Sequence, residues 1–324
     1  MATRSDCNVH GLEFREAKPS QGDPARPVAD LFRLDNRTII ITGATGFLGT
    51  TLAIAILESG GDIVCLDLAS APNSPDWNKV EAAAQKHARQ LSYYPLDVTD
   101  ESGVEKTFTQ FIPTLRYPLK GVVACAGLSR NGPATEFPVS SFRRMLDINV
   151  TGTFLVAQAA AREMLRTNTT GSMVFVASMS GYVSNKGVDT AGYNASKAAV
   201  HQLTRSLAAE WGSRVGMPLI RVNSLSPGYI RTAATAEALQ KPGMESQWVG
   251  DNMLFRLSTA DEFRAPLRID RGQPEALSPG SRDSEVDTLG AILSASAVPI
   301  AWVSVTVVFR LTAKVNKREY WGNT

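Results

Sequence analysis

The chain has few cysteines and histidines: its 324 residues include three of each. Cys65 and Cys125 lie in apolar, strand-like runs and Cys7 in a polar start, a usage that excludes a disulfide framework and favours a reducing compartment. We therefore expect a cytoplasmic protein. Since no cysteines or histidines are paired at ligand spacing, we expect no metal.

The chain also lacks a strong charge of either sign, with 33 Lys and Arg against 31 Asp and Glu. Without a basic stripe interleaved with aromatic residues, nucleic acid is not an expected partner. The first residues carry no continuous apolar run of the secretory kind, and we predict a flexible N-terminal extension over residues 1–34. Residues 35–264 can bury one sizeable core, which predicts a single dinucleotide-binding catalytic domain.

A β-branched run, Thr38–Ile41, opens this domain and leads into a glycine-rich turn. A helix is predicted directly after it, from Phe47 to Ser59. Glycines between a strand and a helix let backbone N–H groups approach a pyrophosphate, whose charge the helix N-terminus favours. The predicted cofactor-binding residues of this turn are Thr42, Gly43, Thr45, Gly46, Phe47, Leu48 and Gly49.

Asp67 ends the next predicted strand. A carboxylate there accepts hydrogen bonds from ribose hydroxyls and repels a 2′-phosphate. No Arg or Lys in the glycine turn or between Asp67 and Asp76 offsets that repulsion. We therefore expect NAD(H) to be preferred, with NADP(H) possible; a solvated strand end without a cofactor role is the alternative for Asp67.

Strands alternate with helical segments as far as the predicted strand Ile220–Leu225. This pattern is typical of an α/β fold with a Rossmann-like, doubly wound parallel sheet. Ligands of such sheets bind at the carboxyl ends of the strands. Gly43, Asp67, Asp97, Gly127, Ser178 and Pro227 all fall at such ends.

Tyr193 and Lys197 are four residues apart on a predicted helix, so that both side chains share one face. A free tyrosine titrates near pH 10, and its use at neutral pH means lowering its pKa by about three units, or roughly 4 kcal/mol. A lysine one turn away, aided by a cationic cofactor, can supply this. Taken alone, Tyr193 and Lys197 also fit an exposed helix surface on which neither residue has a catalytic role.

Together these motifs resemble the short-chain dehydrogenase/reductase family, in its Tyr-x-x-x-Lys branch, over about Arg37 to Arg264. The resemblance implies an oxidoreductase that interconverts a secondary alcohol and a ketone by hydride transfer. Tyr193 would exchange the proton, Lys197 would lower the pKa of Tyr193 and bind the nicotinamide ribose, and Ser178 would hold the substrate oxygen. Ser180 is the rival for the serine role.

The resemblance extends to further positions. It gives Asn149, on the long helix predicted over Val139–Met164, the role of holding a water near Lys197. The remaining residues that it implies in cofactor binding, besides Asn149, Tyr193 and Lys197, are Asp97, Val98, Ala126, Gly127, Pro227, Gly228, Ile230 and Thr232. The segments at Ser178 and Pro227 are similar to those of fungal arabinitol dehydrogenases and sorbose reductases. A polyol or a ketose is thus an expected substrate. The apolar residues Met244, Trp248, Met253, Leu254 and Phe255 could instead line a pocket for a secondary metabolite or form a packed lid.

Two motifs depart from the family pattern. Gly46 stands one place early, with Phe47 in place of a glycine, a spacing similar to the epimerase-like branch and its nucleotide-sugar chemistry. The usual Asn-Asn-Ala-Gly is Ala124-Cys125-Ala126-Gly127, and each missing side-chain hydrogen bond is expected to cost on the order of 1 kcal/mol.

The largest departure follows Arg264, where the family's last strand and its Thr-Gly … Asp-Gly-Gly ending are not found. We predict an atypical tail over residues 265–324, and a homo-oligomer if that tail permits. The uncharged run Ala291–Phe309 fits a non-family ending from an altered reading frame, a substitute edge strand over Ile300–Phe309, or, less well, a membrane span. The alternative function is a dinucleotide-binding scaffold or regulator with little activity.

Overall fold

A six-stranded parallel sheet forms the centre of the protein in the computed structural model, which describes residues 27, 30, 32–214, 216–252 and 254–264. The strands stand in the order β3-β2-β1-β4-β5-β6, and every neighbouring pair is parallel. They are β1 (Thr38–Thr42), β2 (Asp62–Asp67), β3 (Leu91–Pro95), β4 (Leu119–Ala124), β5 (Gly171–Val176) and β6 (Ile220–Leu225). The predicted Rossmann-like fold is confirmed.

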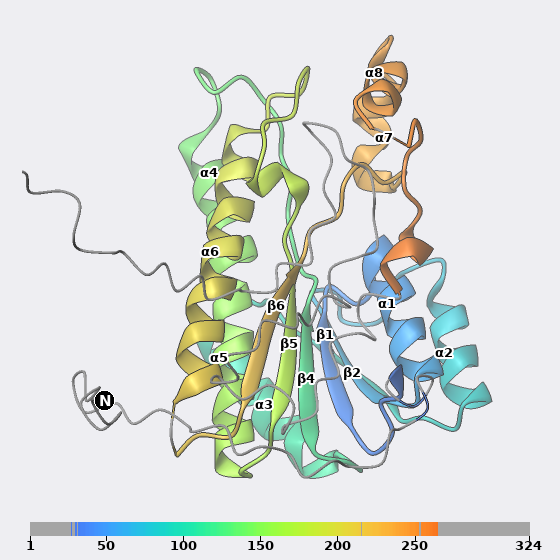
Figure 1. Ribbon diagram of the computed structural model, residues 1–324, viewed down its shortest axis with the longest axis vertical. Helices are drawn as coiled ribbons and strands as arrows, with labels where there is room; N and C mark the ends of the chain where they lie inside the picture. The colour runs from blue at the N-terminus through green and yellow to red at the C-terminus, as the bar shows by residue number, and fades with distance from the viewer. Residues whose placement is uncertain (1–26, 28–29, 31, 215, 253, 265–324) are drawn as a thin grey trace, which may run out of the picture.

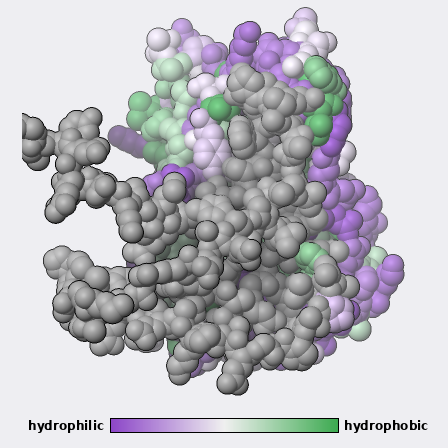
Figure 2. All heavy atoms as spheres, viewed as in Figure 1, coloured by the Kyte–Doolittle hydropathy of each residue, from purple (hydrophilic) through white to green (hydrophobic). Residues whose placement is uncertain are grey.

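Helices cover both faces of this sheet (Figure 1). On one face lie α1 (Phe47–Glu58) and α2 (Trp77–Lys86), and on the other α3 (Glu101–Phe111), α4 (Val139–Leu146), α5 (Thr153–Arg166) and α6 (Ala191–Ser213). The short helices α7 (Ala233–Leu239) and α8 (Met244–Gly250) stand above the carboxyl ends of the strands. Figure 2 shows a mainly hydrophilic outer surface where α1 and α2 lie, at the right of the view.

The core has two halves because successive side chains of a strand point to opposite faces. In β1, Ile39 and Ile41 pack with buried residues of α1 and α2, whereas Ile40 packs with those of α3, α5 and α6. A central strand covered on both faces reads as a continuous apolar run, as β1 does.

The helix predicted over Val139–Met164 is interrupted by a π-helical segment, Asp147–Gly152, between α4 and α5. Such segments are rare and frequent at functional sites. Asn149 lies within this one and is buried. The helical segment predicted over Val139–Met164 is therefore present, and the change in its winding at Asn149 is the feature that the sequence did not predict.

Residues 265–324 and most of the predicted N-terminal extension lie outside the described part of the chain, and so do the alternatives for Ala291–Phe309. Among the described strands, β3 and β6 form the two edges of the sheet. No helix in the described ranges has the length and apolar character needed to span a bilayer. These same residues contain no group of three His, Cys, Asp or Glu side chains that could hold a metal ion.

Candidate active site

Tyr193 and Lys197 lie near the start of α6, beside the carboxyl end of β5. The Lys197 Nζ atom is 5.7 Å from the centroid of the Tyr193 ring. It donates a hydrogen bond of 2.7 Å to the carbonyl oxygen of Val176, the last residue of β5, and the side chain is buried. The predicted helix spacing thus places the ammonium and the phenol side by side.

Ser178 joins this pair from the loop after β5. Its hydroxyl accepts a hydrogen bond from the backbone N–H of Ser180 at 3.1 Å, and its side chain is hydrogen-bonded to that of Tyr193. Ser180, two residues further on, is also buried, and it contributes only its backbone N–H to the contact with Ser178. Of the two candidate serines, the structure brings Ser178 to the phenol.

Asn149 holds the loop after β4 against α6. Its Oδ1 accepts from the N–H of Leu128 at 2.7 Å, and its Nδ2 donates to the Leu128 carbonyl and to the Ser196 hydroxyl, both at 2.9 Å. A Cβ built on Gly127 would lie 3.4 Å from Asn149 Oδ1 and 3.6 Å from Lys197 Nζ, so both polar atoms face this glycine. The amide already has three protein partners, which gives it a bracing role beside the predicted contact with a water.

Burial dominates the electrostatics of the pair. It raises the pKa of Tyr193, although the hydrogen bond to Ser178 acts in the opposite direction. It also lowers the pKa of Lys197 to about 8. The lowering of the Tyr193 pKa by Lys197 that we expected is therefore not seen in the protein by itself, where burial has the larger effect on both groups.

The glycine turn after β1 has the geometry of a phosphate cradle. Gly43 has a φ of +64°, and a Cβ there would lie 2.7 Å from the Ala126 nitrogen. A Cβ on Gly49 would lie 2.0 Å from the Gly43 carbonyl oxygen. Because no side chain caps α1 after the extended Gly46, the first N–H groups of this helix are left for an anion, and a pyrophosphate fits this turn.

The two side chains that follow Gly46 lie in different environments. Phe47 is largely exposed, whereas Leu48 packs against the α1–α2 half of the core. Thr42, at the end of β1, accepts hydrogen bonds of 3.1 Å from the backbone N–H groups of Cys125 and Ala126. The end of β4 therefore keeps a side-chain partner despite its unusual sequence.

Asp67 is fixed at the end of β2. Its Oδ2 accepts from the backbone N–H of Thr45 at 2.8 Å and from the Thr45 hydroxyl at 2.7 Å, and its Oδ1 accepts from the N–H of Leu68 at 2.8 Å. A carboxylate has about four acceptor positions, so one remains for a ribose hydroxyl. Both Thr45 and Asp67 were predicted to bind the cofactor, but the contact between them was not predicted.

Asp97 and Val98 are placed less directly for a ligand. Asp97 accepts from the backbone and hydroxyl of Thr99 and, at 3.1 Å, from the guanidinium of Arg144. Burial alone would raise the pKa of Asp97, but these hydrogen bonds together hold it below its ordinary value. Val98 is buried against Gly152, where a Cβ would lie 2.5 Å from its Cγ2.

The segment after β6 connects the site to α7 and α8. The Pro227 carbonyl accepts from the N–H of Met179 at 3.0 Å, and the Thr232 hydroxyl caps α7. Between them, Tyr229 stacks on Trp248 of α8, with the ring centroids 4.1 Å apart. Gly228 does not have a positive φ, so its backbone conformation does not require a glycine. Ile230 is buried in the α1–α2 half of the core.

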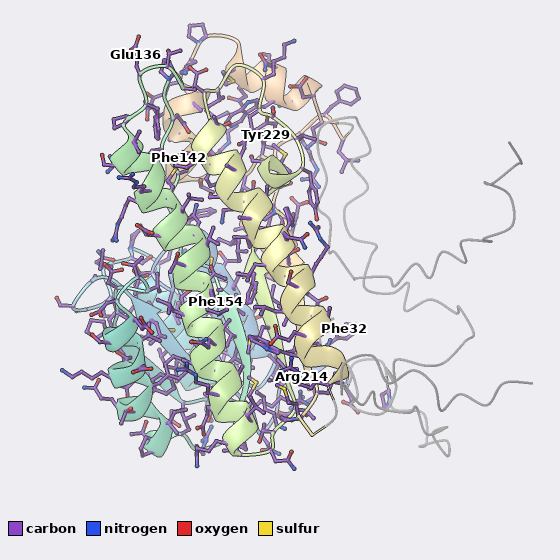
Figure 3. All side chains as sticks on the ribbon, turned by 90° about the vertical axis from the view of Figure 1, so that its left-hand side faces the viewer. Phe32, Glu136, Phe142, Phe154, Arg214 and Tyr229 are labelled. Carbon is purple, nitrogen blue, oxygen red and sulfur yellow. The ribbon has the colours of Figure 1, made fainter. Side chains whose placement is uncertain are left out.

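Figure 3 shows Tyr229 and Phe142 on either side of the upper end of α6. Tyr193 is the third residue of this helix. Phe142 belongs to α4, and a Cβ on Gly192 would lie 3.0 Å from its Cδ2 and 2.6 Å from Met145 Cε. These flanking contacts were not predicted from the sequence. The glycine immediately before Tyr193 was the signal that could have indicated a close helix approach.

Comparison with known proteins agrees with this geometry. Residues 37–243 match the family model described as short chain dehydrogenase. The chain belongs to the short-chain dehydrogenase/reductase family, whose members are oxidoreductases acting on CH–OH and C=O groups.

Two relatives illustrate the range of similarity. A protein of Aspergillus versicolor described as "Short chain dehydrogenases/reductase notP'" is 72% identical over 287 residues, covering 89% of this chain and 98% of the relative. Because that match is longer than residues 35–264, it includes part of the flanking segments. The D-arabinitol 2-dehydrogenase (ribulose-forming) of Candida tropicalis is 34% identical over 242 residues, covering 72% of this chain and 84% of the relative.

The solved structures include proteins with either cofactor. An NADPH-dependent 3-quinuclidinone reductase from Rhodotorula rubra is similar with a TM-score of 0.68 and 26% identity, over 79% of this chain and 92% of that one. NAD+-bound xylitol dehydrogenase has a TM-score of 0.65 and 27% identity, over 74% and 93%. Family relatives thus use NAD(H) or NADP(H).

Proposed function

We propose that this protein interconverts a secondary alcohol and a ketone of a small polyol or ketose, with NAD(H) preferred and Tyr193 as the proton donor and acceptor. The contact that carries the proposal is the hydrogen bond between the Ser178 and Tyr193 side chains, with Lys197 beside them. A hydroxyl and a phenol that meet above a buried ammonium provide the hydrogen bonds and the proton that a carbonyl oxygen needs as it becomes an alcohol.

Each residue has a separate task in this mechanism. A dinucleotide bound here would supply or accept the hydride. The turn from Gly43 to Gly49 would hold its pyrophosphate, and Lys197 would bind its nicotinamide ribose. Ser178 donates a hydrogen bond to the substrate oxygen, while Tyr193 gives its O–H proton to that oxygen in reduction and takes it back in oxidation.

The substrate class rests on the relatives, since D-arabinitol, xylitol and ketoses occur in the names of several. A secondary metabolite is the second candidate, because Trp248 and Met244 of α8 form an apolar cluster with Tyr229 and Met179. A cytoplasmic location and a homo-oligomeric state remain predictions of the sequence analysis.

The test is the turnover of purified protein with D-arabinitol and NAD+, and with D-ribulose, other ketoses and hydrophobic ketones and NADH. We expect Tyr193→Phe to abolish nearly all turnover while NADH affinity, measured by fluorescence, stays within a few-fold. Tyr117→Phe, before β4 at the opposite end of the sheet, is the matched control and should keep full activity.

Near-normal rates for folded Tyr193→Phe would overturn the assigned mechanism. Binding of NADH without turnover of any ketone would favour the scaffold alternative. The Ser178–Tyr193 contact supports the enzyme instead, because a scaffold has no need of it.

A further inference from the structure

His201 lies one turn after Lys197 on α6, is 2% exposed, and has no part in the mechanism above. Its Nε2 lies 3.0 Å from the backbone carbonyl oxygen of Ser178. A carbonyl oxygen only accepts hydrogen bonds, so Nε2 carries the proton and donates it. The Ser224 hydroxyl lies 3.4 Å from Nδ1, which in this tautomer accepts.

The ring is also enclosed by the turn that follows Ser178. The ring centroids of Tyr182 and His201 are 3.8 Å apart, with 30° between the ring planes. A Cβ on Gly181 would lie 2.6 Å from His201 Cδ2, so the turn rests directly on the imidazole. The Ser226 hydroxyl lies 3.4 Å from Nε2, on the side of β6. Burial lowers the pKa of His201, which favours the neutral ring that these contacts need.

His201 holds the backbone carbonyl of Ser178, the residue whose side chain contacts Tyr193. Besides His201, the Ser178 carbonyl accepts from the N–H of Gly181 at 3.0 Å, a contact within the turn itself. Thus the hydrogen bond from His201 is the one that ties the Ser178 carbonyl to α6, the helix that carries Tyr193 and Lys197.

We propose that His201 is a positioning residue that holds the Ser178 peptide against α6 and thereby keeps the Ser178 hydroxyl at Tyr193. This inference rests on the proposed function and adds a residue to it. Because His201 acts through Ser178, its effect on turnover exists only while Ser178 has its hydroxyl. A general structural role would lower turnover whether or not that hydroxyl is present.

The experiment measures D-ribulose reduction with NADH for His201→Leu and His201→Gln, each in the parent and in the Ser178→Ala background. His201→Leu should lower kcat by about tenfold, the usual effect of losing one aligned hydrogen bond, with the KM for NADH unchanged. His201→Gln keeps an N–H donor near the place of Nε2 and should restore kcat to within about threefold of the parent. In the Ser178→Ala background, His201→Leu should cause no further fall.

The matched control is Thr204→Val on the same helix, since Thr204 is fully buried and, within the described part of the chain, its hydroxyl bonds only to the Val200 carbonyl. It should keep the parent kcat. An equal fall caused by His201→Leu in both backgrounds, or a parent-like kcat in His201→Leu, would overturn the proposal.

Crystal structures provide a readout that does not need turnover. In His201→Leu the Ser178 hydroxyl should move out of hydrogen-bond distance of Tyr193, and in His201→Gln it should stay. An unmoved Ser178 in the leucine variant would refute the positioning role. If no ketose is reduced by the parent protein, the proposed function fails, and this comparison still decides the role of His201.

Discussion

Asp67 offers the sharpest test of cofactor choice, because three hydrogen bonds from Thr45 and Leu68 prevent its carboxylate from turning away. A 2′-phosphate carries about −1.5 to −2 charges near pH 7. At a separation of about 5 Å, the repulsion of a 2′-phosphate by one carboxylate amounts to about 1.2–1.7 kcal/mol in water and about 5–7 kcal/mol at the effective dielectric of a protein surface. Even the value in water corresponds to a factor of about ten in affinity.

We therefore expect kcat/KM to be at least about tenfold higher with NADH than with NADPH. Asp67→Asn keeps the size of the side chain and removes its charge, so it should narrow this ratio, and Asp67→Ser should do the same. Thr45→Val removes one of the two donors to Oδ2 and should have a smaller effect. Higher salt should also narrow the ratio in the parent, because exposed charges are screened.

The control for these variants is Glu105→Gln, which removes an exposed carboxylate on α3 and should leave the ratio unchanged. The reasoning is refuted if the parent protein uses NADPH as well as NADH, or if Asp67→Asn leaves the ratio as it was. Either result would show that the restrained carboxylate does not face the 2′ position.

Two further predictions concern stability. The pKa of Lys197 in the folded protein, about 8, lies below the ordinary 10.5, so the unfolded chain binds more protons between these values. The free energy of unfolding of the parent protein should therefore rise from pH 8 to pH 10.5. Below pH 8, Lys197→Met should be more stable than the parent by on the order of 3 kcal/mol. Urea titrations should show this difference vanish above pH 10.5. Gly43→Ala should destabilise the protein by about 2 kcal/mol or more in thermal unfolding. Gly212 has open space around it inside α6, so Gly212→Ala should stabilise the protein by about 0.5–1 kcal/mol. Equal effects of the two substitutions would contradict the tight turn geometry at Gly43.

The parts of the site that the sequence predicted are those set by local geometry. Gly43 could be chosen because a positive φ between a strand and a helix demands glycine. Tyr193 and Lys197 could be paired because helical spacing alone brings them to one face. The alternation of strands and helices gave the order of the elements, and with it the edge of the sheet where these residues meet.

The parts that the sequence did not predict depend on register and packing. Thr45 meets Asp67 because β1 and β2 pair with Thr42 opposite Leu66, a register that no local pattern contains. The π-helical segment around Asn149 was missed because helical periodicity tolerates one extra residue. His201 was counted only as a histidine without a metal-binding partner, since its contacts come from the loop after β5 and from the end of β6.

The opposite shifts of Tyr193 and Lys197 lead to one last consequence. Burial disfavours the phenolate and the ammonium alike, so the protein by itself holds the phenol in its protonated form. A positive charge that enters beside the ring favours the phenolate, and it does so strongly because the site has been removed from water. In the mechanism that we propose, the form of Tyr193 that accepts a proton would thus be coupled to the oxidised cofactor, and the form that donates one would be the resting form. Reduction and oxidation would then use the same tyrosine, with the charge of the cofactor selecting between its two states.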